Sequence, residues 1–186
     1  MTAAAAAAAA AEKVHPPALS LPHWPEVPPA IDPSGRGFLV IAVGADRQMA
    51  ATASRWVKAA EEIGPTTLVE LGAMTSPQDR AALGQALGQA RTGVRIYATG
   101  GQYDVLQVLA AALEAGAIPA ELHSFVTSRR DLPMFCVHCR ATGRVEAAPG
   151  ALADCPGCGR TLEVHPHLAA ARGSFLASDA TARTLS

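Results

Sequence analysis

From residue 37 onward, short continuous apolar runs alternate with longer segments whose apolar residues recur at helical spacing. The runs are typical of strands buried on both faces of a sheet, and we expect them at 37–44, 66–72, 94–100 and 122–127. The longer segments predict helices at 46–63, 76–91 and 103–115. Strands that alternate with helices need crossover connections, so the pattern predicts an α/β fold with a small parallel sheet at 36–131.

Residues 1–35 follow a different pattern. A run of alanines opens the chain, and prolines then recur too densely for a helix or an interior strand. We therefore expect a disordered Ala/Pro-rich arm over 1–35. Trp24 and the other interleaved apolar residues leave open a second interpretation, in which the arm lies across its own domain or across a partner.

All four cysteines of the chain fall in two Cys-x-x-Cys pairs. We call Cys136–Cys139 the first knuckle and Cys155–Cys158 the second knuckle. Such pairs let four thiolates converge on one tetrahedral ion, and this spacing is typical of a zinc ribbon. We expect a zinc ribbon at 132–172, with a β-hairpin between the knuckles and a C-terminal tail at 173–186. Two disulfides or four unused thiols are the alternative.

The metal itself has two candidates. Four cysteines suit Zn²⁺ or a single rubredoxin-type iron. Pro156 and the glycines of the second knuckle would fit rubredoxin, but Arg140 follows the first knuckle where rubredoxin prefers glycine. We expect structural zinc, with iron as the alternative.

Composition narrows the possible partners. The net charge is −1 and aromatic residues make up 4%, which disfavours a nucleic-acid-binding ribbon and an anionic membrane surface. No run reaches the roughly 20 apolar residues of a membrane span. No basic residue precedes the alanine run, so we expect a cytoplasmic protein without an export signal.

The α/β part resembles the nicotinamide-nucleotide domain of ferredoxin reductases. The resemblance rests on Val40–Asp46 and on Arg95–Val126, where Thr99-Gly100-Gly101 stands in place of that family's Cys-Gly-Pro turn. It implies a reductase-like scaffold that could bind NAD(P)H at Gly100 and Gly101. The first turn lacks the family's further glycines, and Asp46 puts a negative charge where phosphates would lie, so we expect nucleotide binding to be lost.

The order of a shortened reductase-like domain, two knuckles and the segment Val164-His165-Pro166-His167 resembles the DmmA-like small subunit of bacterial dimethylamine monooxygenase. The resemblance covers about 37–178. It implies an accessory subunit of a complex that demethylates dimethylamine to methylamine and formaldehyde with NAD(P)H and oxygen. Haem oxygenase and flavin/iron–sulfur reductase subunits would be its partners.

The histidines near the knuckles are further candidates. His165 and His167 would point the same way from an extended segment, and we expect an interface role rather than metal ligation. His138, inside the first knuckle, is expected to face solvent. We find no arrangement typical of a catalytic centre, so we expect no catalytic residue in this chain, whatever the activity of the complex.

Overall fold

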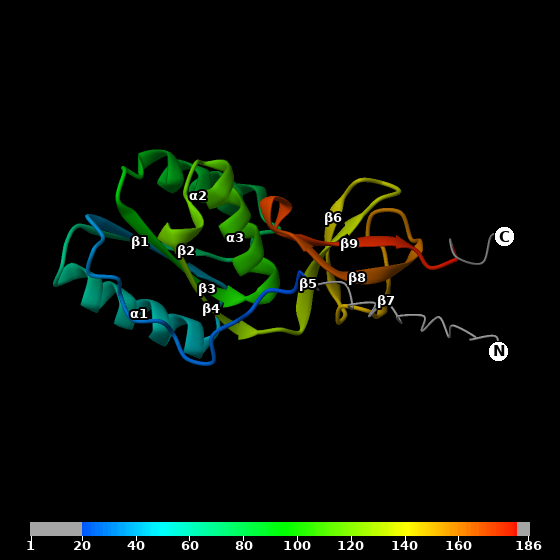
Figure 1. The fold of residues 1–186 in the computed structure, drawn as a ribbon, viewed down its shortest axis with the longest axis horizontal. Helices are drawn as coiled ribbons and strands as arrows, with labels where there is room; N and C mark the ends of the chain where they lie inside the picture. The colour runs from blue at the N-terminus through cyan, green and yellow to red at the C-terminus, as the bar shows by residue number, and fades with distance from the viewer. Residues whose placement is uncertain (1–19, 182–186) are drawn as a thin grey trace, which may run out of the picture.

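The structure, a computed structural model, describes residues 20–181 and contains two sheets that lie end to end (Figure 1). The first sheet has four parallel strands in the order β2-β1-β3-β4. Its strands are β1 (Gly37–Val43), β2 (Thr66–Leu71), β3 (Val94–Gly101) and β4 (Leu122–Ser128). The expectation of an α/β fold on a small parallel sheet is confirmed.

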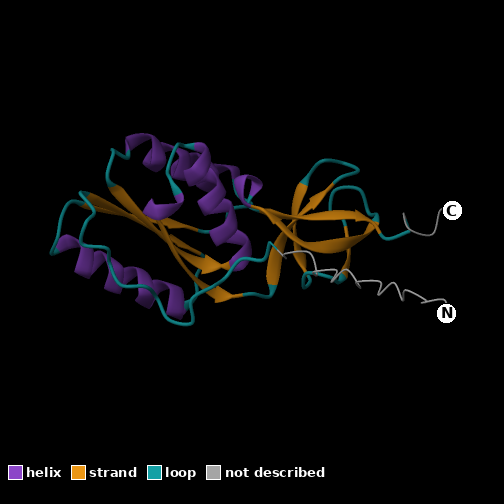
Figure 2. Cartoon of the chain, in the orientation of Figure 1, coloured by secondary structure: helices purple, strands orange, loops and turns teal. Residues whose placement is uncertain are grey.

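Three helices cover the two faces of this sheet (Figure 2). They are α1 (Arg47–Glu61), α2 (Pro77–Gln89) and α3 (Gln102–Glu114), and the short turn η1 (Pro119–Glu121) precedes β4. On one face, Trp56 of α1 packs in a cluster with Phe38 and Val40. The alternate residues of β1 face a second cluster that includes Leu83 of α2 and Val105 of α3. This alternation explains why β1 reads as a continuous apolar run.

Local signals set the starts of two helices. The carboxylate of Asp46 accepts a hydrogen bond from Gln48 N–H at the start of α1. The hydroxyl of Ser76 accepts from Asp79 N–H at the start of α2, and Pro77 occupies the first turn. Both are ordinary N-caps, which satisfy N–H groups that have no partner within the helix.

The second sheet has the strand order β6-β5-β9-β8-β7. Its strands are β5 (Asp131–Cys136), β6 (Thr142–Glu146), β7 (Leu152–Asp154), β8 (Thr161–Ala169) and β9 (Ser174–Asp179), with η2 (Ala170–Arg172) between the last two. The expected hairpin between the knuckles is wrong, because β6 pairs with β5 and β7 pairs with β8. Each knuckle instead forms the turn of its own hairpin.

The expected C-terminal tail at 173–186 is also wrong for its first residues. β9 is the central strand of the second sheet, between β5 and β8. The side chains of Phe175 and Ala177 are fully buried. Alternate residues of β9 therefore face the core, and this segment is not a solvated tail. Residues 182–186 lie outside the described part of the chain.

One continuous core joins the two sheets. A single cluster of buried side chains includes Leu106 of α3, Met134 of β5 and Phe175 of β9. Gly173 lets η2 approach α3 closely, because a Cβ atom there would collide with the carbonyl oxygen of Leu106. The ribbon is therefore packed on α3 rather than tethered by a loop.

The described part of the arm, residues 20–35, is docked on both sheets, so the expectation of disorder is wrong there. Ser20 forms an isolated parallel bridge with His167 of β8. Trp24 is 8% exposed, and its indole N–H donates to Oε1 of Gln102 over 2.9 Å. Proline spacing did not reveal these contacts, because they depend on partners far away in sequence. The alanine run and the rest of 1–19 lie outside the described residues.

Asp32 fastens the other end of the docked segment. Its carboxylate accepts from the Arg95 guanidinium over 2.6 Å, which holds the pKa of Asp32 well below its usual range. The backbone N–H of Asp32 donates to the hydroxyl of Tyr97. The segment therefore lies against the face of the sheet that α1 covers.

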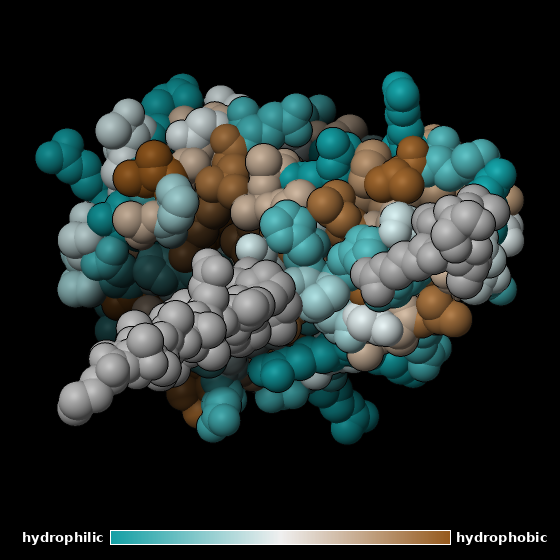
Figure 3. All heavy atoms as spheres, turned by 45° about the vertical axis from the view of Figure 1, so that its right-hand side comes forward, coloured by the Kyte–Doolittle hydropathy of each residue, from teal (hydrophilic) through white to brown (hydrophobic). Residues whose placement is uncertain are grey.

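The exposed surface is mixed. Figure 3 shows one face of the molecule, on which apolar side chains form small groups between hydrophilic ones. Among the described residues, none of the helices has the length and apolar character that a membrane crossing requires.

Candidate metal centre and the adjoining crevice

The two knuckles bring all four cysteine sulfurs to one point. Cys136 ends β5, and Cys155 follows β7, so two hairpins from opposite edges of the second sheet meet there. The four Sγ atoms lie within 4.8 Å of one another. Gly157 eases this approach, since a Cβ atom there would lie 3.2 Å from the sulfur of Cys139, which is a tight contact.

The spacing of the sulfurs fits a tetrahedral metal ion. The Sγ atoms of Cys136 and Cys158 are 3.8 Å apart, and those of Cys139 and Cys155 are 3.6 Å apart. A tetrahedron with metal–sulfur distances of about 2.3 Å has sulfur–sulfur edges of ~3.8 Å. All four cysteines are free, and these separations are far from a covalent bond of about 2.05 Å. The arrangement favours a shared ion over two disulfides.

The thiols do not ionise equally without a cation. For Cys136, burial raises the pKa, but hydrogen bonds from the backbone N–H groups of Cys139 and His138 outweigh it and bring the pKa to about 7. For Cys158, the backbone N–H of Arg160 lowers the pKa, but burial and the neighbouring sulfurs raise it to about 11. A bound cation would favour the thiolate form of all four.

The two knuckles have the same backbone pattern. Cys136 O accepts from Arg140 N–H and Cys155 O accepts from Gly159 N–H, both over 2.8 Å. Both donors adopt left-handed backbone angles, with φ of 59° at Arg140 and 71° at Gly159. Glycine adopts this conformation freely, whereas arginine does so at a cost. The first knuckle therefore keeps a geometry for which its sequence is less suited.

The histidines take no part in this cluster. His138 is exposed, as expected, and does not belong to the group of possible ligands. His165 is half-buried and its Nε2 lies 2.7 Å from the hydroxyl of Ser178 on β9. His167 is exposed beside the docked arm, where it pairs with Ser20. An irregular register between Val164 and Leu168 interrupts the extended segment on which both were expected to point the same way.

Apart from the cysteine cluster, the structure has a crevice where β1 and β3 end. The chain leaves β1 toward β2 on one side and returns to β3 on the other, which is where open α/β sheets usually bind ligands. A crevice of about 540 Å³ opens there. Its lining includes Gly44, Asp46, Gly101, Asp104, Arg130 and Arg144.

The residues of the crevice do not fit the pyrophosphate of a dinucleotide well. At the start of α1, the Asp46 carboxylate already accepts the N–H that a phosphate would use. At the start of α3, the buried carboxylate of Asp104 occupies the first turn. Negative charge at both helix starts opposes a phosphate. The loss of NAD(P)H binding, with Gly100 and Gly101 as the place where it could be retained, stays a prediction.

Gly100 has a packing role in the structure. Its φ is 152°, and a Cβ atom there would lie 2.5 Å from the carbonyl oxygen of Val43. Glycine at this position therefore allows β1 and β3 to approach closely. The sequence resemblance could not separate this role from cofactor binding, since both need the same residue.

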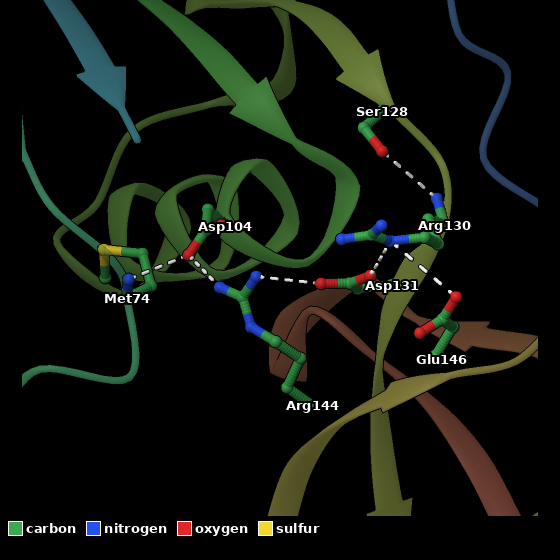
Figure 4. Close-up of polar contacts among 7 residues, drawn as sticks. All are labelled: Met74, Asp104, Ser128, Arg130, Asp131, Arg144 and Glu146. Atoms are coloured by element: carbon green, nitrogen blue, oxygen red, sulfur yellow. Dashed lines mark hydrogen bonds and ion pairs between the residues drawn. The ribbon is translucent and has the colours of Figure 1, made fainter. Parts of the chain in front are cut away.

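A charged network joins the crevice to the ribbon (Figure 4). Arg144 of β6 donates to Asp104 Oδ1 over 2.6 Å and to Asp131 Oδ2 over 3.1 Å. Asp104 Oδ1 also accepts the backbone N–H of Met74 over 2.8 Å. At the exposed end of the network, Nε of Arg130 lies 3.3 Å from Oδ1 of Asp131. Arg144 thus uses its planar fork to bridge two carboxylates from different parts of the fold.

Sequence reasoning did not single out Asp104, Asp131 or Arg144. Charged residues of this kind are common on surfaces, and no local motif marks them. The sequence shows that Arg144 falls between the two knuckles, but this position does not indicate its contacts. Its partner on α3 could not be inferred without the packing of the two sheets.

Comparison with known proteins finds one family and one solved structure. Residues 133–177 match the family described as dimethylamine monooxygenase subunit DmmA-like, C-terminal domain. The similar structure is phthalate dioxygenase reductase, described as a modular structure for electron transfer from pyridine nucleotides to [2Fe–2S]; it has 13% identity and a TM-score of 0.40. The match covers 65% of this chain but 47% of the reductase, so the chain spans about half of it. No curated protein is significantly similar in sequence.

Proposed function

We propose that this chain, whose residues 133–177 match the DmmA-like C-terminal domain family, is an accessory metal-binding subunit of an oxidoreductase complex. The specific form of the proposal is a dimethylamine monooxygenase that uses NAD(P)H and oxygen to produce methylamine and formaldehyde. Haem oxygenase and flavin/iron–sulfur reductase subunits would carry the redox centres. We place the complex in the cytoplasm, where thiolates stay reduced.

The carrying observation is the closed cysteine cluster within the matched segment. Cys136, Cys139, Cys155 and Cys158 together supply the four ligands of a structural zinc site, which leaves no position for a substrate. Bound zinc would cross-link the two hairpins that carry the knuckles. The ribbon then serves as a stable surface next to α3. Its role is to bind and orient the partner subunits, not to take part in the chemical reaction.

Co-expression tests the accessory role. The chain carries an affinity tag and is produced together with candidate oxygenase and reductase subunits from the same organism, and the purified material is separated by size-exclusion chromatography. We expect the subunits to elute together and to demethylate dimethylamine only when this chain is present. If the other subunits are fully active without it and elute apart from it, the proposal is wrong.

The second candidate is a rubredoxin-like electron carrier. The backbone N–H of Cys139 lies 3.5 Å from the sulfur of Cys136, as expected for a site whose sulfurs are stabilised by the backbone. The two candidates differ in the metal that the cysteines hold. Elemental analysis of colourless protein with one zinc per chain supports the accessory role, whereas a coloured iron protein that can be reversibly reduced supports electron transfer.

NAD(P)H is the remaining cofactor question. The two carboxylates at the helix starts argue for a scaffold that has lost nucleotide binding. We expect calorimetric titration of the isolated chain with NADPH to give no heat of binding. Binding that is lost in Gly101→Asp, and not in a distant surface variant, would place the nucleotide in the crevice and revise this part of the proposal.

A further inference from the structure

β2 is an end strand of the parallel sheet, and its outer edge has no pairing partner among residues 20–181. The direction of its backbone groups follows from two bonds to β1. The carbonyl of Pro65 accepts from Phe38 N–H, and the carbonyl of Leu71 accepts from Gly44 N–H. Since alternate residues of a strand direct both backbone groups to the same side, Thr66, Leu68 and Glu70 direct theirs outward.

Glu70 is the one charged side chain of this edge strand, and the centre of the strand is apolar. Leu68 is 42% exposed, although Val40, its register partner on β1, is fully buried. The pairing of β1 with β2 is regular, without a bulge, and β2 contains no lysine and no proline. Soluble proteins usually protect an open edge with such features. An exposed edge with an apolar centre indicates a strand that pairs with something outside the described residues.

We propose that the outer edge of β2 pairs antiparallel with β2 of a second copy of this chain, about a two-fold axis at Leu68. The dimer would join two four-stranded sheets into one continuous sheet. Each outward-facing N–H and C=O of β2 would then have a partner across the axis. This inference is independent of the function proposed above.

The sequence of the edge favours a second copy as the occupant. Only the register centred on Leu68 pairs all three outward-facing residues within β2. It places Leu68 opposite Leu68, and Thr66 opposite Glu70. No two carboxylates face each other, and the two exposed leucines cover one another. The edge is therefore complementary to itself in hydrogen bonding and apolar contact, and this register keeps the two Glu70 carboxylates apart.

Sedimentation of the full-length protein with its bound metal tests the dimer. We expect a monomer–dimer equilibrium over a concentration series, and Leu68→Lys should weaken the dimer by about tenfold or more, because two ammonium groups then face each other. Ile63→Lys is the matched control. Ile63 is 43% exposed but precedes β2, so the same change of charge there should leave the equilibrium unaltered. Circular dichroism checks that both variants keep the fold.

A cross-linking experiment tests the register. In Leu68→Cys, the two Cβ atoms at position 68 would lie about 5 Å apart across the axis, which brings the introduced thiols within reach of a short thiol cross-linker. The same linker should not join Ile63→Cys. A monomer at every concentration would overturn the proposal, as would a dimer that Leu68→Lys leaves unchanged. Hydrogen-exchange protection of β2 that depends on another subunit would assign the edge to that subunit instead.

Discussion

The guanidinium of Arg144 lies 2.6 Å from the carboxylate of Asp104, and this contact links the ribbon to the helix that follows β3. Arg144 is on β6, between the two knuckles, and Asp104 is in the first turn of α3. The Asp104 side chain is 8% exposed and that of Arg144 is 31% exposed. The contact joins the hairpin that contains the first knuckle to the crevice at the ends of β1 and β3.

Removal of Arg144 should destabilise the protein. Arg144→Ala leaves the buried Asp104 carboxylate with the Met74 N–H as its hydrogen-bond donor among the described residues, and we expect a loss of about 2 kcal/mol in urea unfolding. Arg130→Ala is the control, because the Arg130 side chain is 71% exposed and should contribute less than about 0.5 kcal/mol. Equal losses in the two variants would show that burial of the Asp104 pair is not the cause.

Loss of one cysteine ligand should release the metal. In Cys158→Ser, we expect the zinc content to fall from about one per chain to near zero, and hydrogen exchange to rise across β5 to β9. Zinc binding contributes about 10–16 kcal/mol in small metal-binding peptides, so the ribbon should lose much of its stability. His138→Ala should keep its full metal content, since His138 lies outside the sulfur cluster. A parallel loss of metal in His138→Ala would contradict the four-cysteine site.

The left-handed backbone at Arg140 gives a stabilising substitution. Arg140→Gly should raise stability by up to about 1 kcal/mol, because glycine adopts a φ of 59° without a steric cost. Gly159→Ala is the reciprocal test at the matching position of the second knuckle, and it should lower stability by about 1 kcal/mol. Thermal unfolding of the two metal-loaded variants measures both effects. A lower stability of Arg140→Gly, or a higher stability of Gly159→Ala, would show that the backbone angle does not govern these positions.

The stability should fall on mild acidification because of His123. This residue of β4 stacks on Tyr97 with ring centroids 4.5 Å apart, and burial lowers its pKa from the usual value near 6.5. The unfolded chain then binds more protons than the folded chain below pH 6.5. The stabilisation is complete above that pH and is lost as the pH falls toward the lowered folded pKa.

His123→Phe removes this titration and keeps the stacked ring. Unfolding experiments at a series of pH values should show a flatter dependence in the variant than in the wild type just below pH 6.5. Comparison of the two proteins cancels the effect of the other histidines. Identical pH profiles would rule out His123 as the group responsible.

The arm should contribute to stability through Trp24. Trp24→Phe keeps an aromatic ring but removes the N–H that Gln102 Oε1 accepts, and Gln102 is itself buried. We expect a loss of about 1–2 kcal/mol, the usual cost of a buried polar atom without its partner. Val27→Ala changes an exposed apolar residue of the same segment and should have an effect within about 0.5 kcal/mol. A small effect of both changes would indicate that the segment docks without this hydrogen bond.

The sequence alone determined the strands and helices of the parallel sheet and the grouping of the cysteines. Both follow from local rules: a run such as Gly37–Val43 is apolar throughout because both of its faces are covered, and paired knuckles have a fixed spacing. The tertiary structure decided which strands pair with one another and which distant side chains are in contact. It placed β6 and β7 at opposite edges of the second sheet, made 174–179 a central strand and docked Trp24 on Gln102. Such pairings depend on the packing of distant segments, and no short stretch of sequence encodes that packing.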